Sequence, residues 1–296
     1  FSLSSKMARP MATVLITGAT GGIGTDIASR LVAEGKNVYV TGRSQQKLNN
    51  LIDQLNPMKT RDDQIIGQFQ FDIGWLTDIK REMPQICKVP FDTVIFNAGI
   101  MFPKTPRSAN EDDLPWMEDT LKTNIVGHFL MARHLLAEQK QSIRFVCLSS
   151  VTAKFPLRWM RWKTSPSEFH HFFARSNYFT DGWTSYIDSK LAAIVMAQWL
   201  NKQDNKSAVA VHPGVATTAI VLSIPENQRK ILSPLSRFQK NDGTNVCANN
   251  VINAALSPDD FTNTWICHDT VAIPRLSEVQ KNSFMDFLHE LTKDFM

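Results

Sequence analysis

The 296-residue sequence has no apolar run approaching the roughly 20 residues of a membrane-spanning helix, so we expect a soluble protein without a transmembrane segment. Its four cysteines lie far apart and form no C-x-x-C pair, which argues against a disulfide framework and fits reduced thiols. The 32 basic and 28 acidic residues are interspersed, with no run of one sign long enough to suggest a nucleic-acid-binding surface. We therefore expect no nucleic-acid partner.

The first eleven residues have a composition of their own. The stretch from Phe1 to Met11 is rich in serine, basic and free of acids, which is typical of organellar targeting segments and their remnants. A disordered leader is the alternative interpretation. We expect a location in the mitochondrial matrix or another organelle lumen, with the cytoplasm as the alternative.

Along the rest of the chain, short apolar runs typical of buried strands alternate with helical patterns. The strand-like runs lie at 13–16, 37–41, 65–71, 93–96, 143–148, 208–211 and 264–267. The helical patterns lie at about 27–32, 44–55, 76–83, 114–137, 183–201, 242–256 and 276–293. This alternation predicts an α/β fold with one doubly wound parallel sheet of about seven strands, flanked by helices. Because no second core or repeat is visible, we expect residues 12–296 to form a single domain.

A glycine-rich segment, Thr17-Gly18-x-x-x-Gly22-Ile23-Gly24, joins the first strand to the first helix. Such a turn brings unpaired backbone N–H groups and the positive end of a helix close to an anion, usually a phosphate. The spacing differs from the G-x-G-x-x-G of the common dinucleotide fingerprint. A tight turn without a ligand is the alternative interpretation.

The segment Tyr186-Ile-Asp-Ser-Lys190 lies within a helical pattern. Residues four apart share a helix face, so the Lys190 ammonium can lie near the Tyr186 phenol. A cation there favours the phenolate and lowers the tyrosine pKa from about 10 toward the range useful for acid–base catalysis. An incidental pair on a solvated helix face is the alternative.

Further polar residues follow the predicted strands. Ser150 ends the fifth strand, where its hydroxyl can bond to a substrate oxygen that Tyr186 protonates; a simple turn is the alternative. Asn124 interrupts a helical pattern, which favours a local kink with a polar role over a tolerated surface residue. The turn at 97–99 ends the fourth strand beside the glycine-rich segment.

These motifs, together with Pro213-Gly214, resemble the short-chain dehydrogenase/reductase family in order and spacing over nearly the whole chain. The segments 124–130 and 188–191 are most similar to the retinol dehydrogenase and protochlorophyllide reductase branch. The resemblance implies a Rossmann fold and hydride transfer between a nicotinamide and a carbonyl or alcohol. It makes Tyr186 the proton donor or acceptor, and Lys190 the residue that lowers its pKa and holds the nicotinamide ribose. Ser150 then orients the substrate oxygen, and Asn124 holds a water of the proton relay.

The resemblance also implies the cofactor site. Arg43 stands where NAD-dependent members carry an acid after the second strand, and it can pair with a 2′-phosphate, so we expect NADP(H) rather than NAD(H). Gly21 replaces a second basic residue of many NADP-dependent members. Asp72 resembles the family residue beside the adenine, with a helix N-terminal acid as the alternative. The residues expected to bind cofactor are Thr17, Gly18, Gly22, Ile23, Gly24, Arg43, Asp72, Asn97, Ala98, Gly99, Tyr186, Lys190, Pro213, Gly214 and Thr217.

An insert at 151–182 separates Ser150 from the catalytic helix and interleaves aromatic with basic residues. Three interpretations are open: an apolar lid or wall for the substrate, a surface for a membrane or partner protein, and a satellite hydrophobic cluster. His170-His171 lacks a nearby carboxylate or cysteine at useful spacing, so we expect no metal site.

We therefore expect an NADP(H)-dependent oxidoreductase that acts on a carbonyl or alcohol of an apolar small molecule. The alternative is a nucleotide-binding structural or regulatory subunit of a larger, organellar assembly. Monomer, homodimer and subunit of a larger complex all fit the sequence, as does a peripheral membrane or protein partner at the 151–182 insert.

Overall fold

The computed structural model describes residues 12–101, 114–154, 162–174, 182–216, 218–225, 243–257, 265–266 and 276–296. All strand pairs in its central sheet are parallel, in the order β3-β2-β1-β4-β5-β6-β7. The strands are β1 (Thr13–Ile16), β2 (Asn37–Gly42), β3 (Ile66–Gln70), β4 (Thr93–Phe96), β5 (Ile143–Leu148), β6 (Lys206–Val211) and the two-residue edge strand β7 (Trp265–Ile266). The expected parallel α/β sheet is confirmed. Because the strand order reverses direction between β1 and β4, a crevice for a ligand is expected there.

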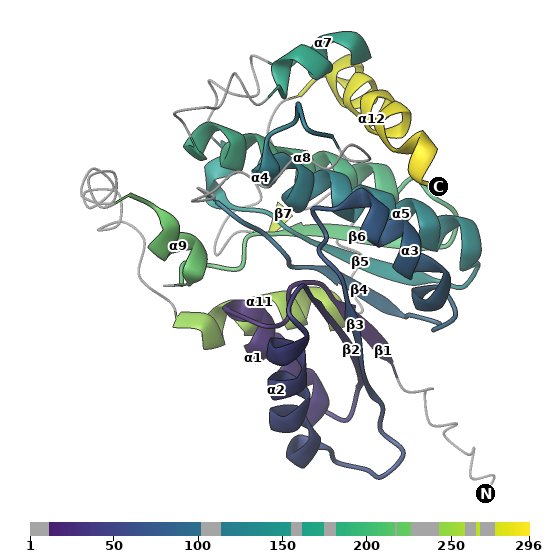
Figure 1. Ribbon diagram of the computed structural model, residues 1–296, viewed down its shortest axis with the longest axis vertical. Coiled ribbons are helices and arrows are strands. Elements are labelled where there is room, and N and C mark those ends of the chain that lie inside the picture. The colour runs from purple at the N-terminus through teal and green to yellow at the C-terminus, as the bar shows by residue number, and fades with distance from the viewer. Residues whose placement is uncertain are drawn as a thin grey trace, which may run out of the picture.

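Helices cover both faces of the sheet (Figure 1). One face is covered by α1 (Ile23–Ala33), α2 (Gln45–Leu55) and α11 (Gly243–Leu256), and the other by α3 (Leu76–Ile86), α5 (Gly127–Glu138) and α8 (Gly182–Leu200). Side chains of a strand alternate between faces, so Val14 and Ile16 join the core under α1, whereas Leu15 joins the core under α3 and α5. Each face of the sheet thus has its own hydrophobic core.

The helix expected at 114–137 is divided. Its first turn is α4 (Asp119–Leu121), where the Glu118 carboxylate accepts hydrogen bonds from the backbone of Thr120 and Leu121. A π-helical turn at Lys122–Val126 follows before α5 begins. A π turn shifts backbone hydrogen bonds by one residue, and such turns occur often at functional sites. The expected irregularity at Asn124 is therefore present as a π turn.

Much of the described insert packs against the C-terminal helix α12 (Glu278–Thr292). The insert contains η3 (Val151–Lys154) and α7 (Pro166–Phe172), and α7 lies beside α12 (Figure 1). Trp162, Phe169 and Phe173 are buried, and the Trp162 ring lies 4.8 Å from that of Phe284 on α12. For these three aromatics the structure supports the packing interpretation. The insert aromatics Phe155, Trp159, Tyr178 and Phe179 lie outside the described residues.

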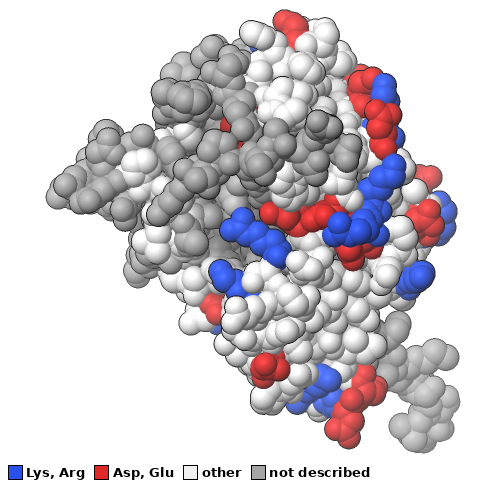
Figure 2. All heavy atoms as spheres, viewed as in Figure 1, with Lys and Arg blue, Asp and Glu red and all other residues white. Residues whose placement is uncertain are grey.

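The remaining described elements are short. They are α9 (Ala219–Ser223), η1 (Asn56–Met58) and η5 (Lys293–Phe295). On the face shown in Figure 2, acidic and basic side chains lie close to one another, in line with their interspersion along the sequence. None of the helices within the described ranges is both long and apolar enough to cross a membrane.

Candidate functional site

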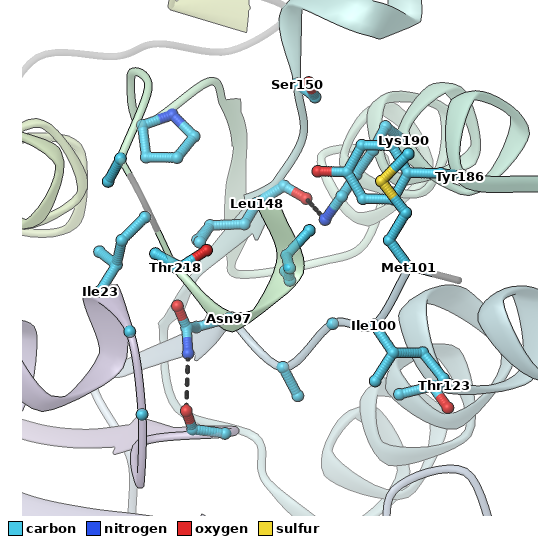
Figure 3. A pocket seen from close by; sticks show the side chains of 18 of the residues that line it. Ile23, Asn97, Ile100, Met101, Thr123, Leu148, Ser150, Tyr186, Lys190 and Thr218 are labelled. Carbon is cyan, nitrogen blue, oxygen red and sulfur yellow. Dashed lines mark hydrogen bonds between the residues drawn. The ribbon is translucent and has the colours of Figure 1, made fainter. Parts of the chain in front are cut away.

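A pocket of about 470 Å³ opens at the carboxyl ends of the strands. Its lining comes from the glycine-rich turn after β1, the ends of β2, β4, β5 and β6, and the first turns of α8 (Figure 3). The pocket therefore lies where the reversal of strand order predicts a ligand crevice.

The glycine-rich turn is shaped by close backbone contacts. Gly18 and Gly22 have φ values of 64° and 57°, in the left-handed region that favours glycine. A Cβ atom at Gly18 would lie 2.7 Å from the Ala98 Cα, so a larger residue cannot fit against the turn after β4. The Asn97 amide donates hydrogen bonds to the carbonyls of Thr17 and Gly18, at 2.9 and 3.0 Å. The two turns thus form one rigid floor with backbone exposed to the pocket.

The pocket brings together Ser150, Tyr186 and Lys190. The Lys190 ammonium donates a hydrogen bond of 3.0 Å to the carbonyl of Leu148 and lies 5.4 Å from the centre of the Tyr186 ring. Because burial disfavours the ammonium, the pKa of Lys190 falls to about 8. This set can exchange a proton with an oxygen bound beside it.

The expected lowering of the Tyr186 pKa by Lys190 is not seen in this structure. Burial raises the pKa of Tyr186 to about 12, and the Ser150 hydroxyl opposes that rise. The physical reason is that desolvation of the phenolate outweighs any attraction to the ammonium, which lies over the ring at 5.4 Å from its centre. In this structure the tyrosine is therefore a neutral phenol with a proton to donate.

Asn124 does not line the pocket but lies directly behind it. Its amide oxygen accepts a hydrogen bond of 2.8 Å from the Ile100 N–H, and its amide nitrogen donates to the Ile100 carbonyl and the Ser189 hydroxyl, both at 3.0 Å. A Cβ atom at Gly99 would lie 3.5 Å from the Asn124 amide oxygen and 3.6 Å from the Lys190 nitrogen. Asn124 therefore joins the turn after β4 to helix α8.

Most of the residues expected to bind cofactor do line the pocket. They are Gly18, Gly22, Ile23, Arg43, Asp72, Asn97, Ala98, Gly99, Tyr186, Lys190, Pro213 and Gly214. Thr17 and Gly24 do not: the Thr17 side chain is buried beneath the turn, and a Cβ atom at Gly24 would lie 2.6 Å from the Gly18 carbonyl oxygen. These two support the turn from behind. Thr217 lies outside the described residues.

The structure adds residues to the site that the sequence reasoning did not name. Thr20, Ser44 and Lys47 line the pocket with Arg43. The signal for Lys47 was present in the sequence, because Ser44 caps α2 and Lys47 stands three residues later, on its first turn. Among the described residues no salt bridge involves Arg43 or Lys47, and Asp72 is the single acid in the lining. The rim at β2 and α2 is thus positively charged.

The family model of the short chain dehydrogenase matches residues 12–162, slightly more than half of the chain. The short-chain dehydrogenase TIC 32 A, chloroplastic, of Brassica napus is 29% identical over 223 residues, covering 70% of this chain and 64% of the relative. Retinol dehydrogenase 13 of Homo sapiens is 29% identical over 226 residues, covering 73% of this chain and 62% of the relative. The matches thus span a little under two thirds of these relatives.

Solved structures share the fold. A blue fluorescent protein from a metagenomic library, solved with NADPH, superposes with a TM-score of 0.63 at 20% identity, covering 87% of this chain and 96% of that one. A single-residue variant of the actinorhodin polyketide ketoreductase, also solved with NADPH, gives a TM-score of 0.61 at 19% identity, covering 84% of this chain and 91% of that one. At such identities the likeness shows the Rossmann fold.

Proposed function

This chain belongs to the short-chain dehydrogenase family, and from that membership we propose that it is an NADP(H)-dependent oxidoreductase acting on a carbonyl or alcohol of an apolar small molecule. The observation that carries the proposal is the meeting of three features in one pocket. These are the glycine-rich backbone floor, the positively charged rim and the Ser150–Tyr186–Lys190 set.

The residues around the pocket fit a nicotinamide dinucleotide. The left-handed glycines and the closely packed turn after β4 leave bare backbone where a pyrophosphate can approach. Asp72 and Ile73 line the end of the pocket proposed for the adenine. Bound there, the cofactor supplies or accepts the hydride.

Arg43 and Lys47 support NADP(H) over NAD(H). Both side chains are exposed at the rim, and no described carboxylate neutralises them. A ribose 2′-phosphate carries up to two negative charges, whereas the 2′-hydroxyl of NAD carries none. Two structures that share the fold were solved with NADPH, which supports proposing this cofactor.

In the proposed reaction Tyr186 moves the proton. The neutral phenol donates its proton to a carbonyl oxygen that becomes an alcohol, and the phenolate takes it back in the reverse direction. The Ser150 hydroxyl orients that oxygen, because both residues face the same pocket. The Lys190 ammonium stabilises the phenolate once it forms.

Apolar side chains favour an apolar substrate. Met101, Val151, Trp183, Ile220 and Ile224 line the pocket with Tyr186. Helix α9, which carries Ile220, is held there because the Ser223 hydroxyl donates a hydrogen bond of 2.6 Å to the carbonyl of Met101. Trp183, directly after the insert, thus provides an apolar wall of the pocket, whereas the insert residues Trp162, Phe169 and Phe173 are buried in the core.

The experiment is a turnover assay with NADPH and a panel of retinal, aromatic and steroid carbonyls, followed by absorbance at the reduced-nicotinamide band. We expect oxidation of NADPH with at least one apolar carbonyl, at a rate about 10²- to 10⁴-fold lower in the Tyr186→Phe variant. Binding of NADPH without turnover of any panel member would contradict the proposal.

The alternative of a structural or regulatory nucleotide-binding subunit is not favoured, because such a module has no need of Ser150, Tyr186 and Lys190 in one pocket. For the location we propose an organelle, on the basis of relatives named as chloroplastic. The names of these relatives give no support for the mitochondrial matrix. The oligomeric state and the single-domain organisation over 12–296 stay predictions.

A further inference from the structure

A buried line of hydrogen bonds connects the glycine-rich turn to the residues behind the catalytic set, and His128 is its centre. One ring nitrogen of His128, Nε2, lies 2.9 Å from the Thr17 hydroxyl. The other, Nδ1, lies 3.0 Å from the backbone carbonyl oxygen of Asn124. His128 is 2% exposed, and its ring lies against that of Phe96, with 4.8 Å between centroids.

The direction of these hydrogen bonds follows from counting donors and acceptors. A hydroxyl oxygen has two lone pairs and one proton. The Thr17 oxygen accepts from the N–H groups of Ala98 and Asn97, each at 3.0 Å, and the Asn97 N–H is shared with the Ile95 carbonyl at 3.0 Å, so both lone pairs face N–H donors. Its proton must then be donated, and the His128 Nε2 at 2.9 Å is a better acceptor than the Ile95 carbonyl at 3.4 Å.

This assignment determines the tautomer of the imidazole. Because Nε2 accepts the Thr17 proton, a neutral His128 carries its own proton on Nδ1 and donates it to the Asn124 carbonyl. Burial lowers the pKa of His128 to about 3; the hydrogen bond to the Asn124 carbonyl opposes this shift, and the nearby Lys190 ammonium adds to it. The ring is therefore neutral throughout the physiological range.

Asn124 connects His128 to helix α8, which carries Tyr186 and Lys190. Its side-chain amide bonds to the Ile100 backbone and to Ser189, whose hydroxyl donates to the Tyr186 carbonyl at 2.7 Å. His128 holds the backbone of the same residue within the π turn. One continuous set of contacts therefore runs from Thr17, beneath the cofactor turn, to the first turns of α8.

We propose that His128 is a positioning residue, which as its Nδ1–H tautomer couples the glycine-rich cofactor turn to Asn124 and thereby to the Tyr186–Lys190 helix. The role in catalysis rests on the proposed function, whereas the hydrogen-bond line does not. His128 touches neither the pocket nor the reacting atoms. Its contribution is the geometry that places the phenol relative to the cofactor floor.

The hydrogen-bond line is tested on the cofactor-free protein by long-range ¹H–¹⁵N NMR of the seven histidines, with His128→Gln to assign the signal. We expect the Nδ1–H tautomer for His128, without titration between pH 5 and 9. An Nε2–H tautomer, or a ring that titrates in that range, overturns the proposal.

The catalytic role is tested by kinetics of three variants. His128→Leu removes donor and acceptor, His128→Gln retains one of each, and His134→Leu is the control, because His134 lies on the same helix and bonds to Phe295 at the C-terminus instead. We expect His128→Leu to lower kcat about 10- to 100-fold with little change in the KM for NADPH, the range seen when support of a catalytic group is lost. His128→Gln should recover most of kcat.

The outcomes distinguish a failure of the positioning role of His128 from a failure of the proposed function. Normal kcat in a folded His128→Leu protein refutes the role of His128. Wild-type protein that binds NADPH without turnover refutes the proposed function and the kinetic role with it, and the NMR result then decides the hydrogen-bond line alone. If His128→Leu does not fold, the kcat of His128→Gln decides. A kcat equal to that of the wild type supports the proposal, and a kcat as low as that of Tyr186→Phe overturns it.

Discussion

Removing the positive charge at the rim should change the choice of cofactor. Arg43 and Lys47 are exposed, so each contact to a 2′-phosphate is screened by water and is worth about 0.5 to 1 kcal/mol rather than the value of a buried pair. Together they amount to about 1 to 2 kcal/mol, which corresponds to a roughly 5- to 30-fold weaker Kd for NADPH. The Kd for NADH should not change, because no phosphate faces the rim.

The assay is a fluorescence titration of the wild type and the Arg43→Gln/Lys47→Gln double variant with NADPH and NADH. Lys59→Gln is the control, since Lys59 is exposed and lies outside the pocket. Added salt should weaken NADPH binding more in the wild type than in the double variant, because the Debye length is only about 10 Å at 0.1 M. The reasoning would be refuted if the double variant bound NADPH and NADH more weakly by the same factor, or if the wild type bound NADH more tightly than NADPH.

Three further predictions follow from the site. Tyr186→Phe should lower kcat by about 10²- to 10⁴-fold in the turnover assay while NADPH still binds in the fluorescence titration, because only the proton-transfer group is lost. Lys190→Met should raise the melting temperature of the cofactor-free protein at pH 7. The folded pKa of about 8 lies below the unfolded value, so the cost of burying the ammonium, up to roughly 3 kcal/mol, is present below pH 8. That cost disappears as the pH rises toward about 10.5, so the melting temperature should rise less at that pH. An equal rise in melting temperature at pH 7 and pH 10.5 would contradict the prediction. Gly127→Ala should destabilise by about 1 to 3 kcal/mol in urea unfolding, because a methyl group there overlaps the Ile73 carbonyl oxygen, whereas Gly21→Ala, with open space around it, should not.

Local patterns in the sequence were sufficient to predict several parts of the fold and of the site. The four-residue spacing of Tyr186 and Lys190 places both on one helix face whatever the rest of the fold does. The glycines at 18 and 22 mark a turn because their backbone angles are costly for other residues. The parallel sheet also follows locally, since strands that alternate with helices must be connected by crossovers.

Other parts depend on contacts that no local pattern contains. The aromatic residues Trp162, Phe169 and Phe173 could not be assigned to a lid or a core from the insert alone, because their partners Phe284 and Phe287 lie more than a hundred residues away. The joining of Lys47 to the Arg43 rim required the orientation of α2 on the sheet.

The sequence by itself determined the fold class and the identity of the residues at the strand ends, because these depend on short-range periodicity and turn chemistry, and its motifs resemble those of one family. Only the tertiary structure decided how those residues are used. It placed Thr17 and Gly24 behind the floor of the pocket rather than in it, and Asn124 behind Ser150, Tyr186 and Lys190. It raised the pKa of Tyr186 and lowered that of Lys190, since burial is a property of the packed chain. Desolvation and long-range hydrogen bonds arise only when distant segments meet, which is why they could not be obtained from the order of the residues.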